Sequence, residues 1–207
     1  MEIKTLLEQL KQNLIDTSYI EIIAVFFGLL SVWYAKKESI RVYPTGIINV
    51  LIYVYLCFSA GLYGDMGINA FYFVMSVYGW YNWSRKDENS KEISITRCNK
   101  KELIFNMLAF LLFFGILWFI LERYTPSTVP VLDSFTTALF IIAMWQMARK
   151  KIENWIAWII GDALVIPMFA YKELIFTSFQ FIVFLILAIS GYLEWRKKLM
   201  ILKKNIG

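Results

Sequence analysis

Long apolar runs, separated by short charged or polar segments, make up most of this chain. Seven such runs can be distinguished, and each gives way to charged or polar residues at its ends. Their lengths are close to the about 20 residues that an α-helix needs to cross a lipid bilayer. The runs cover residues 20–35, 44–60, 67–83, 104–121, 134–148, 155–171 and 174–195. The pattern therefore predicts an all-α integral membrane protein with seven transmembrane helices.

Composition indicates that a bilayer, and not water, is the main solvent of the protein. Hydrophobic residues make up 59% of the 207 residues and the mean hydropathy is +0.56, whereas soluble domains are about 45–50% apolar. Seven spans with short connections leave no room for a separate soluble domain. The formal net charge is +5, but the basic residues lie between the apolar runs. They are interpreted as anchors beside the membrane and not as a nucleic-acid surface.

The reactive side chains narrow the possible chemistry. The chain has no histidine, which removes an imidazole proton relay, Ser-His or Cys-His catalysis and a His-ligated metal. Cys57 lies in an apolar run and Cys98 in a polar loop, so neither a disulfide framework nor a Cys-based metal site is expected. No cofactor and no metal are predicted.

The amino-terminal segment, residues 1–19, has a different pattern. It lacks the continuous apolar stretch of a signal peptide. Its apolar residues recur at helical spacing instead, which predicts an amphipathic helix lying along the membrane surface. These residues are Leu6, Leu7, Leu10, Leu14 and Ile15.

The distribution of Lys and Arg predicts the orientation of the chain. Seven spans place successive loops on alternate sides of the membrane. One side then carries 17 of the 21 Lys and Arg residues, and the other carries only Lys4, Lys11, Arg123 and Lys172. Cytoplasmic loops of membrane proteins carry the excess of basic residues. The amino terminus is therefore expected outside the cell and the carboxyl terminus in the cytoplasm.

An internal repeat emerges when the chain is compared with itself at an offset of 112 positions. Each half has a Trp followed by a basic turn and closes on a Gly-aromatic-x-x-Trp sequence. Matched pairs are Trp33 and Trp145, Ile40 and Ile152, Leu62 and Leu174, Gly79 and Gly191, and Trp83 and Trp195. The constant offset and the matched glycines favour a repeat over a simple belt of interfacial tryptophans.

Because each repeat holds three spans, the two copies share an orientation only if one further span lies between them. The result is a 3+1+3 arrangement with parallel internal repeats, which transporters use with the substrate site between the halves near the midplane. The predicted units are an amphipathic segment at 1–19, a first three-helix repeat at 20–83, a polar loop and linker helix at 84–133, a second three-helix repeat at 134–198 and a basic cytoplasmic tail at 199–207.

Asp162 is the only carboxylate well inside a predicted span. A charge at that depth costs at least ~2.5 kcal/mol, and no basic residue lies in the central part of any span. The carboxylate either holds a helix pair together by hydrogen bonding or balances the charge of a cationic substrate or a proton. An ionisable group inside a membrane favours the functional interpretation.

Trp155, Trp158 and Asp162 share one helix face because they lie at positions i, i+3 and i+7. Two indoles and a carboxylate suit a flat cation, which an aromatic face attracts by roughly 0.5–2 kcal/mol. Polar residues on other spans could hydrogen-bond a sugar ring or could simply pack the helices together. These residues are Asn49, Tyr53, Asn69, Tyr72, Thr177 and Gln180.

Several segments resemble the Pnu family of bacterial vitamin transporters. They are YPTGIIN at 43–49, YGWYNW at 78–83, ENWIAWIIGD at 153–162 and GYLEW at 191–195, and the resemblance covers about residues 20–200. It implies a helix plan like that of the SWEET sugar transporters and uptake of an unphosphorylated vitamin precursor by facilitated diffusion. It further implies a cytoplasmic kinase that traps the product, a homotrimer, and a place in the bacterial inner membrane.

The resemblance leaves the substrate open. Trp155 and Trp158 would stack on the pyridinium of nicotinamide riboside, Asp162 would balance its charge, and Asn49, Asn69 and Gln180 would bond the ribose. Where riboside-type members are expected to have Asn, this chain has Asp162, so thiamine, also a cation, is the alternative.

Other classes of function fit the sequence less well. Proton coupling through Asp162 is a further alternative for a carrier. An intramembrane lipid-modifying enzyme usually needs clustered acids, histidines or a metal site, which one isolated aspartate does not supply. A structural subunit would turn its polar stripes toward neighbouring chains. The sequence therefore predicts a transporter and not an enzyme.

Overall fold

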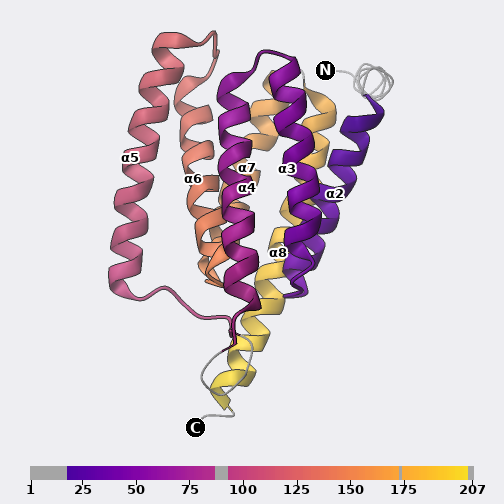
Figure 1. The fold of residues 1–207 in the computed structure, drawn as a ribbon. Helices are drawn as coiled ribbons and strands as arrows, with labels where there is room; N and C mark the ends of the chain where they lie inside the picture. The colour runs from indigo at the N-terminus through magenta and orange to yellow at the C-terminus, as the bar shows by residue number, and fades with distance from the viewer. Residues whose placement is uncertain (1–17, 87–92, 173, 205–207) are drawn as a thin grey trace.

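The computed structural model of the protein describes residues 18–86, 93–172 and 174–204, which form seven α-helices (Figure 1). The number and order of the helices confirm the all-α prediction. The predicted amino-terminal helix at 1–19 lies outside the described residues except for its last two positions. The helices are α2 (Tyr19–Lys36), α3 (Val42–Ser59), α4 (Tyr63–Ser84), α5 (Lys100–Tyr124), α6 (Pro130–Ala148), α7 (Glu153–Tyr171) and α8 (Ile175–Lys204).

Local sequence explains where several helices begin. The Ser18 hydroxyl accepts a hydrogen bond from the Glu21 backbone at 3.2 Å and caps α2. Asn99 and Glu102 form a capping box at the start of α5, each side chain accepting from the other's backbone N–H at 2.9 Å. Pro130 begins α6, where a missing N–H costs nothing. Charged and polar residues thus fix helix starts at the ends of the apolar runs.

Six of the seven helices are long and apolar enough to cross a membrane. The seventh, α4, has 22 residues, enough for about 33 Å at 1.5 Å per residue, and runs beside α3 in Figure 1. It is less apolar because it carries Asp65, Asn69 and Asn82. α8 continues beyond the predicted end of its span at residue 195 and projects from the bundle (Figure 1).

Six of the helices form a closed ring. α3 packs between α2 and α4, and α7 packs between α6 and α8. The two groups of three meet where α2 contacts α8 and where α4 contacts α6. α5 packs against α6 and lies outside the ring (Figure 1). A shift of 112 positions maps α2, α3 and α4 onto α6, α7 and α8 to within one residue at every helix start, and it exchanges the two contacts that close the ring.

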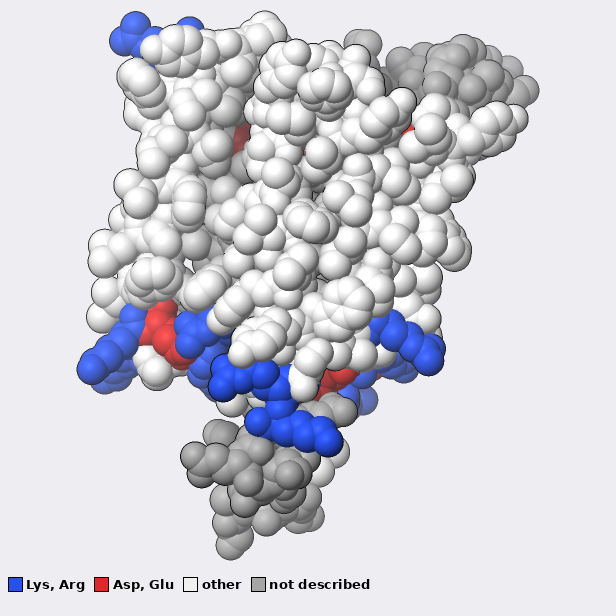
Figure 2. Space-filling model, in the orientation of Figure 1, with Lys and Arg blue, Asp and Glu red and all other residues white. Residues whose placement is uncertain are grey.

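Lys and Arg side chains gather at one end of the bundle, from which the end of α8 projects (Figure 2). We call this the basic end. α2, α4 and α6 end there, and α3, α5 and α7 begin there. The face of the bundle between its two ends is almost free of charged side chains (Figure 2). This banding is the pattern of a protein that presents its middle to lipid.

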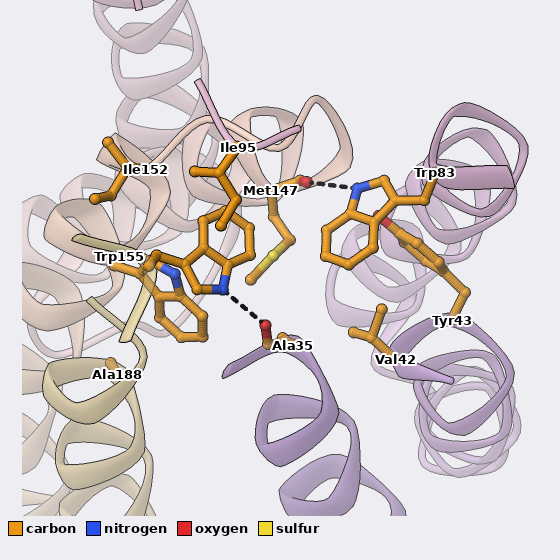
Figure 3. Close-up of a cluster of buried hydrophobic side chains, with 10 residues drawn as sticks. Ala35, Val42, Tyr43, Trp83, Ile95, Met147, Ile152, Trp155 and Ala188 are labelled. Carbon is orange, nitrogen blue, oxygen red and sulfur yellow. Dashed lines mark hydrogen bonds between the residues drawn. The ribbon is translucent and has the colours of Figure 1, made fainter. Parts of the chain in front are cut away.

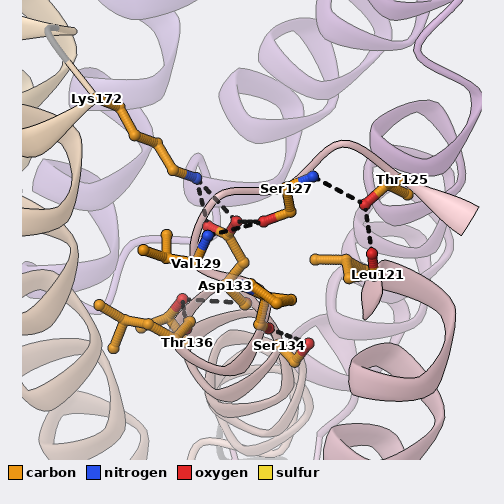
Figure 4. A network of polar contacts seen from close by, with 10 residues as sticks. Leu121, Thr125, Ser127, Val129, Asp133, Ser134, Thr136 and Lys172 are labelled. Carbon is orange, nitrogen blue, oxygen red and sulfur yellow. Dashed lines mark hydrogen bonds and ion pairs between the residues drawn. The ribbon is translucent and has the colours of Figure 1, made fainter. Parts of the chain in front are cut away.

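A compact polar network organises the other end of the bundle (Figure 4). The Lys172 ammonium donates to both carboxylate oxygens of Asp133 at 2.7 and 2.8 Å. The Ser127 hydroxyl donates to the same carboxylate at 2.6 Å and accepts from the Val129 backbone at 3.3 Å. The network ties the connection between α5 and α6 to the end of α7.

Candidate functional site

Near the basic end, buried side chains from both halves of the ring form one cluster (Figure 3). We call it the basic-end cluster. Its central members are large aromatic residues, and Trp155 and Trp195 are at most 1% exposed. The cluster comprises Ala35, Val42, Tyr43, Trp83, Ile95, Met147, Ile152, Trp155, Ala188 and Trp195.

Two indole hydrogen bonds cross between the halves within this cluster (Figure 3). Trp83 Nε1 on α4 donates to the Met147 carbonyl on α6 at 3.2 Å, and Trp195 Nε1 on α8 donates to the Ala35 carbonyl on α2 at 3.0 Å. Donors and acceptors are both 112 positions apart. The last helix of each half is therefore bonded to the first helix of the other half by an equivalent contact.

An ion pair lies at the same end and also joins equivalent positions. Glu38 and Lys150 are 112 positions apart, and both adopt a left-handed backbone, with φ of 59° and 52°. Lys150 is 1% exposed. Its ammonium lies 3.0 Å from Glu38 Oε1 and 4.6 Å from the centre of the Trp83 ring. Lys198 reaches the second Glu38 oxygen at 2.8 Å. Three charges from the two halves thus meet at one point.

Residues 93–98, which precede α5, pack against this ion pair. The Ile93 carbonyl accepts from the Lys150 ammonium at 2.7 Å, and Ile95 is only 2% exposed within the basic-end cluster. Thr96 exchanges backbone hydrogen bonds with the segment around Lys150, at 3.0 Å each way. Burial, and then the nearby Glu153 carboxylate, raise the pKa of the Cys98 thiol to about 12. Cys98 is therefore held as a neutral thiol.

The predicted stripe on α7 is divided between two environments. Trp155 belongs to the basic-end cluster, and its Nε1 has no hydrogen-bond partner among the described residues. Trp158 is half-buried and stacks on Phe140 of α6, with ring centres 5.1 Å apart. Asp162 is 3% exposed. Within the described ranges, no hydrogen bond or ion pair engages its carboxylate. Asp162 is thus a buried acid without a fixed partner.

The predicted polar residues of the other helices are only partly brought together. Asn49 donates to the Ala24 carbonyl on α2 at 2.7 Å. Tyr53 on α3 and Gln180 on α8 are half-buried. Asn69 donates at 2.9 Å to a carbonyl of its own helix in an exposed setting. Asn49 therefore joins α3 to α2 within the first half, whereas the Asn69 amide is engaged within its own helix.

Tyr72 and Thr177 are half-buried. Neither side chain forms a hydrogen bond to another described residue. Their place in a substrate site stays a prediction.

Sequence reasoning missed Phe140, Glu38 and Lys150. Phe140 is one more aromatic residue in an apolar run, and Glu38 and Lys150 read as ordinary border charges. The offset of 112 was the available signal, because it pairs Glu38 with Lys150 and Phe140 with Gly28.

Gly191 offers a direct test of packing at the basic end. A Cβ at this position would lie 2.6 Å from the Trp155 ring, so Gly191→Ala is expected to destabilise the protein by about 1–3 kcal/mol through overpacking. Thermal unfolding of the purified protein in detergent measures the loss. The matched control is Gly115→Ala on α5, where a Cβ would meet no described atom within 4 Å. Equal melting temperatures for the two variants would contradict the packing at Gly191.

Two groups of three helices that share one offset and close into a single ring are typical of membrane transporters built from internal repeats. Residues 18–197 match the model of a family described as "Nicotinamide mononucleotide transporter". The chain belongs to this family, which confirms the vitamin-transporter resemblance. It is a multi-pass membrane protein of a transporter family and not an enzyme.

Curated relatives carry two different substrate names. The chain is 27% identical to the nicotinamide riboside transporter PnuC of Escherichia coli (strain K12), covering 87% of this chain and 86% of the relative. It is 23% identical to the riboflavin/roseoflavin transporter RibM of Streptomyces davaonensis, covering 84% and 83%. A crystal structure of the vitamin B3 transporter PnuC has the same fold, with a TM-score of 0.69 and 23% identity over 93% of this chain and 88% of that one.

Proposed function

We propose that this protein imports nicotinamide riboside across the bacterial inner membrane by facilitated diffusion, with its basic end in the cytoplasm. The observation that carries the proposal is Asp162, an acid that is 3% exposed and follows Trp158 by about one turn on α7. A pyridinium cation would supply the positive counter-charge that this carboxylate lacks. The names of the curated relatives support a vitamin precursor of this kind.

In this proposal the chain is a 3+1+3 carrier with parallel repeats, and α4 is its seventh spanning helix. The shared offset of helices, indole bonds and ion-pair positions supports the repeats. The gathering of Lys and Arg at one end supports a cytoplasmic carboxyl terminus (Figure 2). The substrate would bind between the halves near mid-depth, at the level of Asp162 and Tyr53, with Trp158 nearer the basic end and Gln180 nearer the opposite end.

Net uptake in a passive carrier needs a sink for the substrate. A cytoplasmic kinase that phosphorylates the riboside would provide it, because the added phosphate is strongly negative and does not fit a mostly apolar site that already holds an acid. The kinase and the homotrimer stay predictions from the family resemblance.

Two other vitamins are candidate substrates. Thiamine carries a flat thiazolium cation, which would balance the charge of Asp162 equally well. Riboflavin is suggested by the name of one relative, but its ring is neutral and would leave the Asp162 carboxylate without a counter-charge. Asp162 therefore ranks the two cations above riboflavin.

Calorimetry with the purified protein would test the proposal. We expect saturable binding of nicotinamide riboside, weaker or no binding of its 5′-phosphate, and uptake of the riboside into proteoliposomes without an imposed ion gradient. Tight thiamine binding with no riboside binding would replace the substrate and keep the carrier. Riboside uptake that requires a pH gradient would replace facilitated diffusion with proton coupling.

A further inference from the structure

Each half of the ring has a glycine on one helix that faces a larger residue on the next helix. The two halves carry the glycine on opposite helices of this pair. In the first half, Gly28 on α2 faces Asn49 on α3, whose amide nitrogen would lie 2.9 Å from a Cβ on that glycine. In the second half, Gly161 on α7 faces Phe140 on α6, whose ring occupies the space that a Cβ would need. The offset of 112 relates Gly28 to Phe140 and Asn49 to Gly161. One half therefore presents an amide where the other presents an aromatic ring.

Phe140 belongs to a series of neighbouring aromatic rings. One neighbour is Trp158, with ring centres 5.1 Å apart and planes inclined by 27°. The other is Phe181 on α8, at 6.2 Å and 13°. Phe181 contacts Phe184, and the Phe184 ring would lie 3.7 Å from a Cβ on Gly28. The series of rings therefore extends from Trp158 on α7 to Gly28 on α2, which faces Asn49.

We propose that Phe140 is a specificity-determining positioning residue. It holds the Trp158 indole in the plane in which the indole stacks on a flat substrate ring. The ring of the ligand then lies toward the second half, and its hydroxyl groups lie toward Asn49 in the first half. The inference rests on the proposed function, because it concerns the substrate site of the same carrier.

The contacts of Phe140 show why a change there would act through Trp158. Gly161 lets Phe140 approach the backbone of α7 closely, three residues beyond Trp158 on the same helix. Stacked between Trp158 and Phe181, the Phe140 ring limits the tilt of the indole. A leucine would fill much of the same volume but would leave the indole without a parallel surface.

The test compares Phe140→Leu with Phe140→Tyr, which keeps the ring. We expect Phe140→Leu to raise the Kd and the KM for nicotinamide riboside about fivefold, in the range of one stacked aromatic pair, with kcat within about twofold, and Phe140→Tyr to restore binding. Phe110→Leu is the matched control, since Phe110 stacks on Phe114 at 6.1 Å but lies on α5, outside the ring. It should leave Kd unchanged.

A double-mutant cycle separates positioning from general packing. In a Trp158→Leu background, Phe140→Leu should weaken binding by less than about 1.5-fold, because the ring has nothing left to position. The same fivefold loss in both backgrounds would overturn the inference. If the unaltered protein binds thiamine or riboflavin and not the riboside, the proposed substrate fails, and the same cycle with the bound vitamin still decides the role of Phe140.

Discussion

Asp162→Asn is expected to weaken the binding of nicotinamide riboside about tenfold or more. Asparagine keeps the size and shape of the side chain and one acceptor oxygen, and it removes the negative charge. A tenfold loss corresponds to about 1.4 kcal/mol, which is well below the about 4 kcal/mol between unit charges 4 Å apart at an effective dielectric constant of 20. Calorimetry with purified protein measures the change. The reason for the large effect is that Asp162 is 3% exposed and solvent screens it little.

A neutral ligand supplies the control for this prediction. Dihydronicotinamide riboside keeps the ribose and the amide but has no ring charge, so its affinity should change less than about twofold in Asp162→Asn. Asp65→Asn is the matched control variant, because the Asp65 side chain is exposed on α4. If Asp162→Asn leaves the affinity for the cation unchanged and lowers the melting temperature instead, Asp162 serves helix packing and not substrate charge.

The number and approximate limits of the helices could be predicted because lipid permits few solutions. A spanning segment must satisfy its backbone internally, so an apolar run of sufficient length becomes a helix. The two main differences have local causes. α4 falls below the other helices in apolarity because it contains Asp65, Asn69 and Asn82. α8 continues to Lys204 because nothing after residue 195 breaks a helix, even though the segment there is basic.

The candidate site was less predictable, because spacing along one helix says nothing of the neighbouring helix. Trp155 and Trp158 share a face of α7, yet Trp155 packs beneath Gly191 and Trp158 stacks on Phe140. These partners lie on α8 and α6. In the sequence, only the internal repeat relates residues on one helix to residues on another.

The second large effect is expected on the stability of variants at Glu38 and its partner Lys150. Glu38→Gln should destabilise the protein by about 3–5 kcal/mol, because it leaves the Lys150 ammonium, on a residue that is 1% exposed, without its counter-charge. Lys150→Met should cost less, since Glu38 keeps its ion pair with Lys198 at 2.8 Å. The two single variants and the double variant all keep a non-glycine residue at the left-handed positions, so backbone strain is the same in each.

The double variant Glu38→Gln, Lys150→Met should be more stable than Glu38→Gln alone, although it carries one more substitution. Removing both partners abolishes the buried unpaired charge that makes the single change costly. Thermal unfolding in detergent gives the order. Glu194→Gln, which breaks a partly exposed pair with Lys36 at 3.2 Å, should cost at most about 1 kcal/mol. A double variant as unstable as Glu38→Gln would mean that Glu38 acts mainly through Lys198. Since both crossing indole bonds lie beside this ion pair, the double variant should also show whether the charges or the indoles dominate the contact between the halves at the basic end.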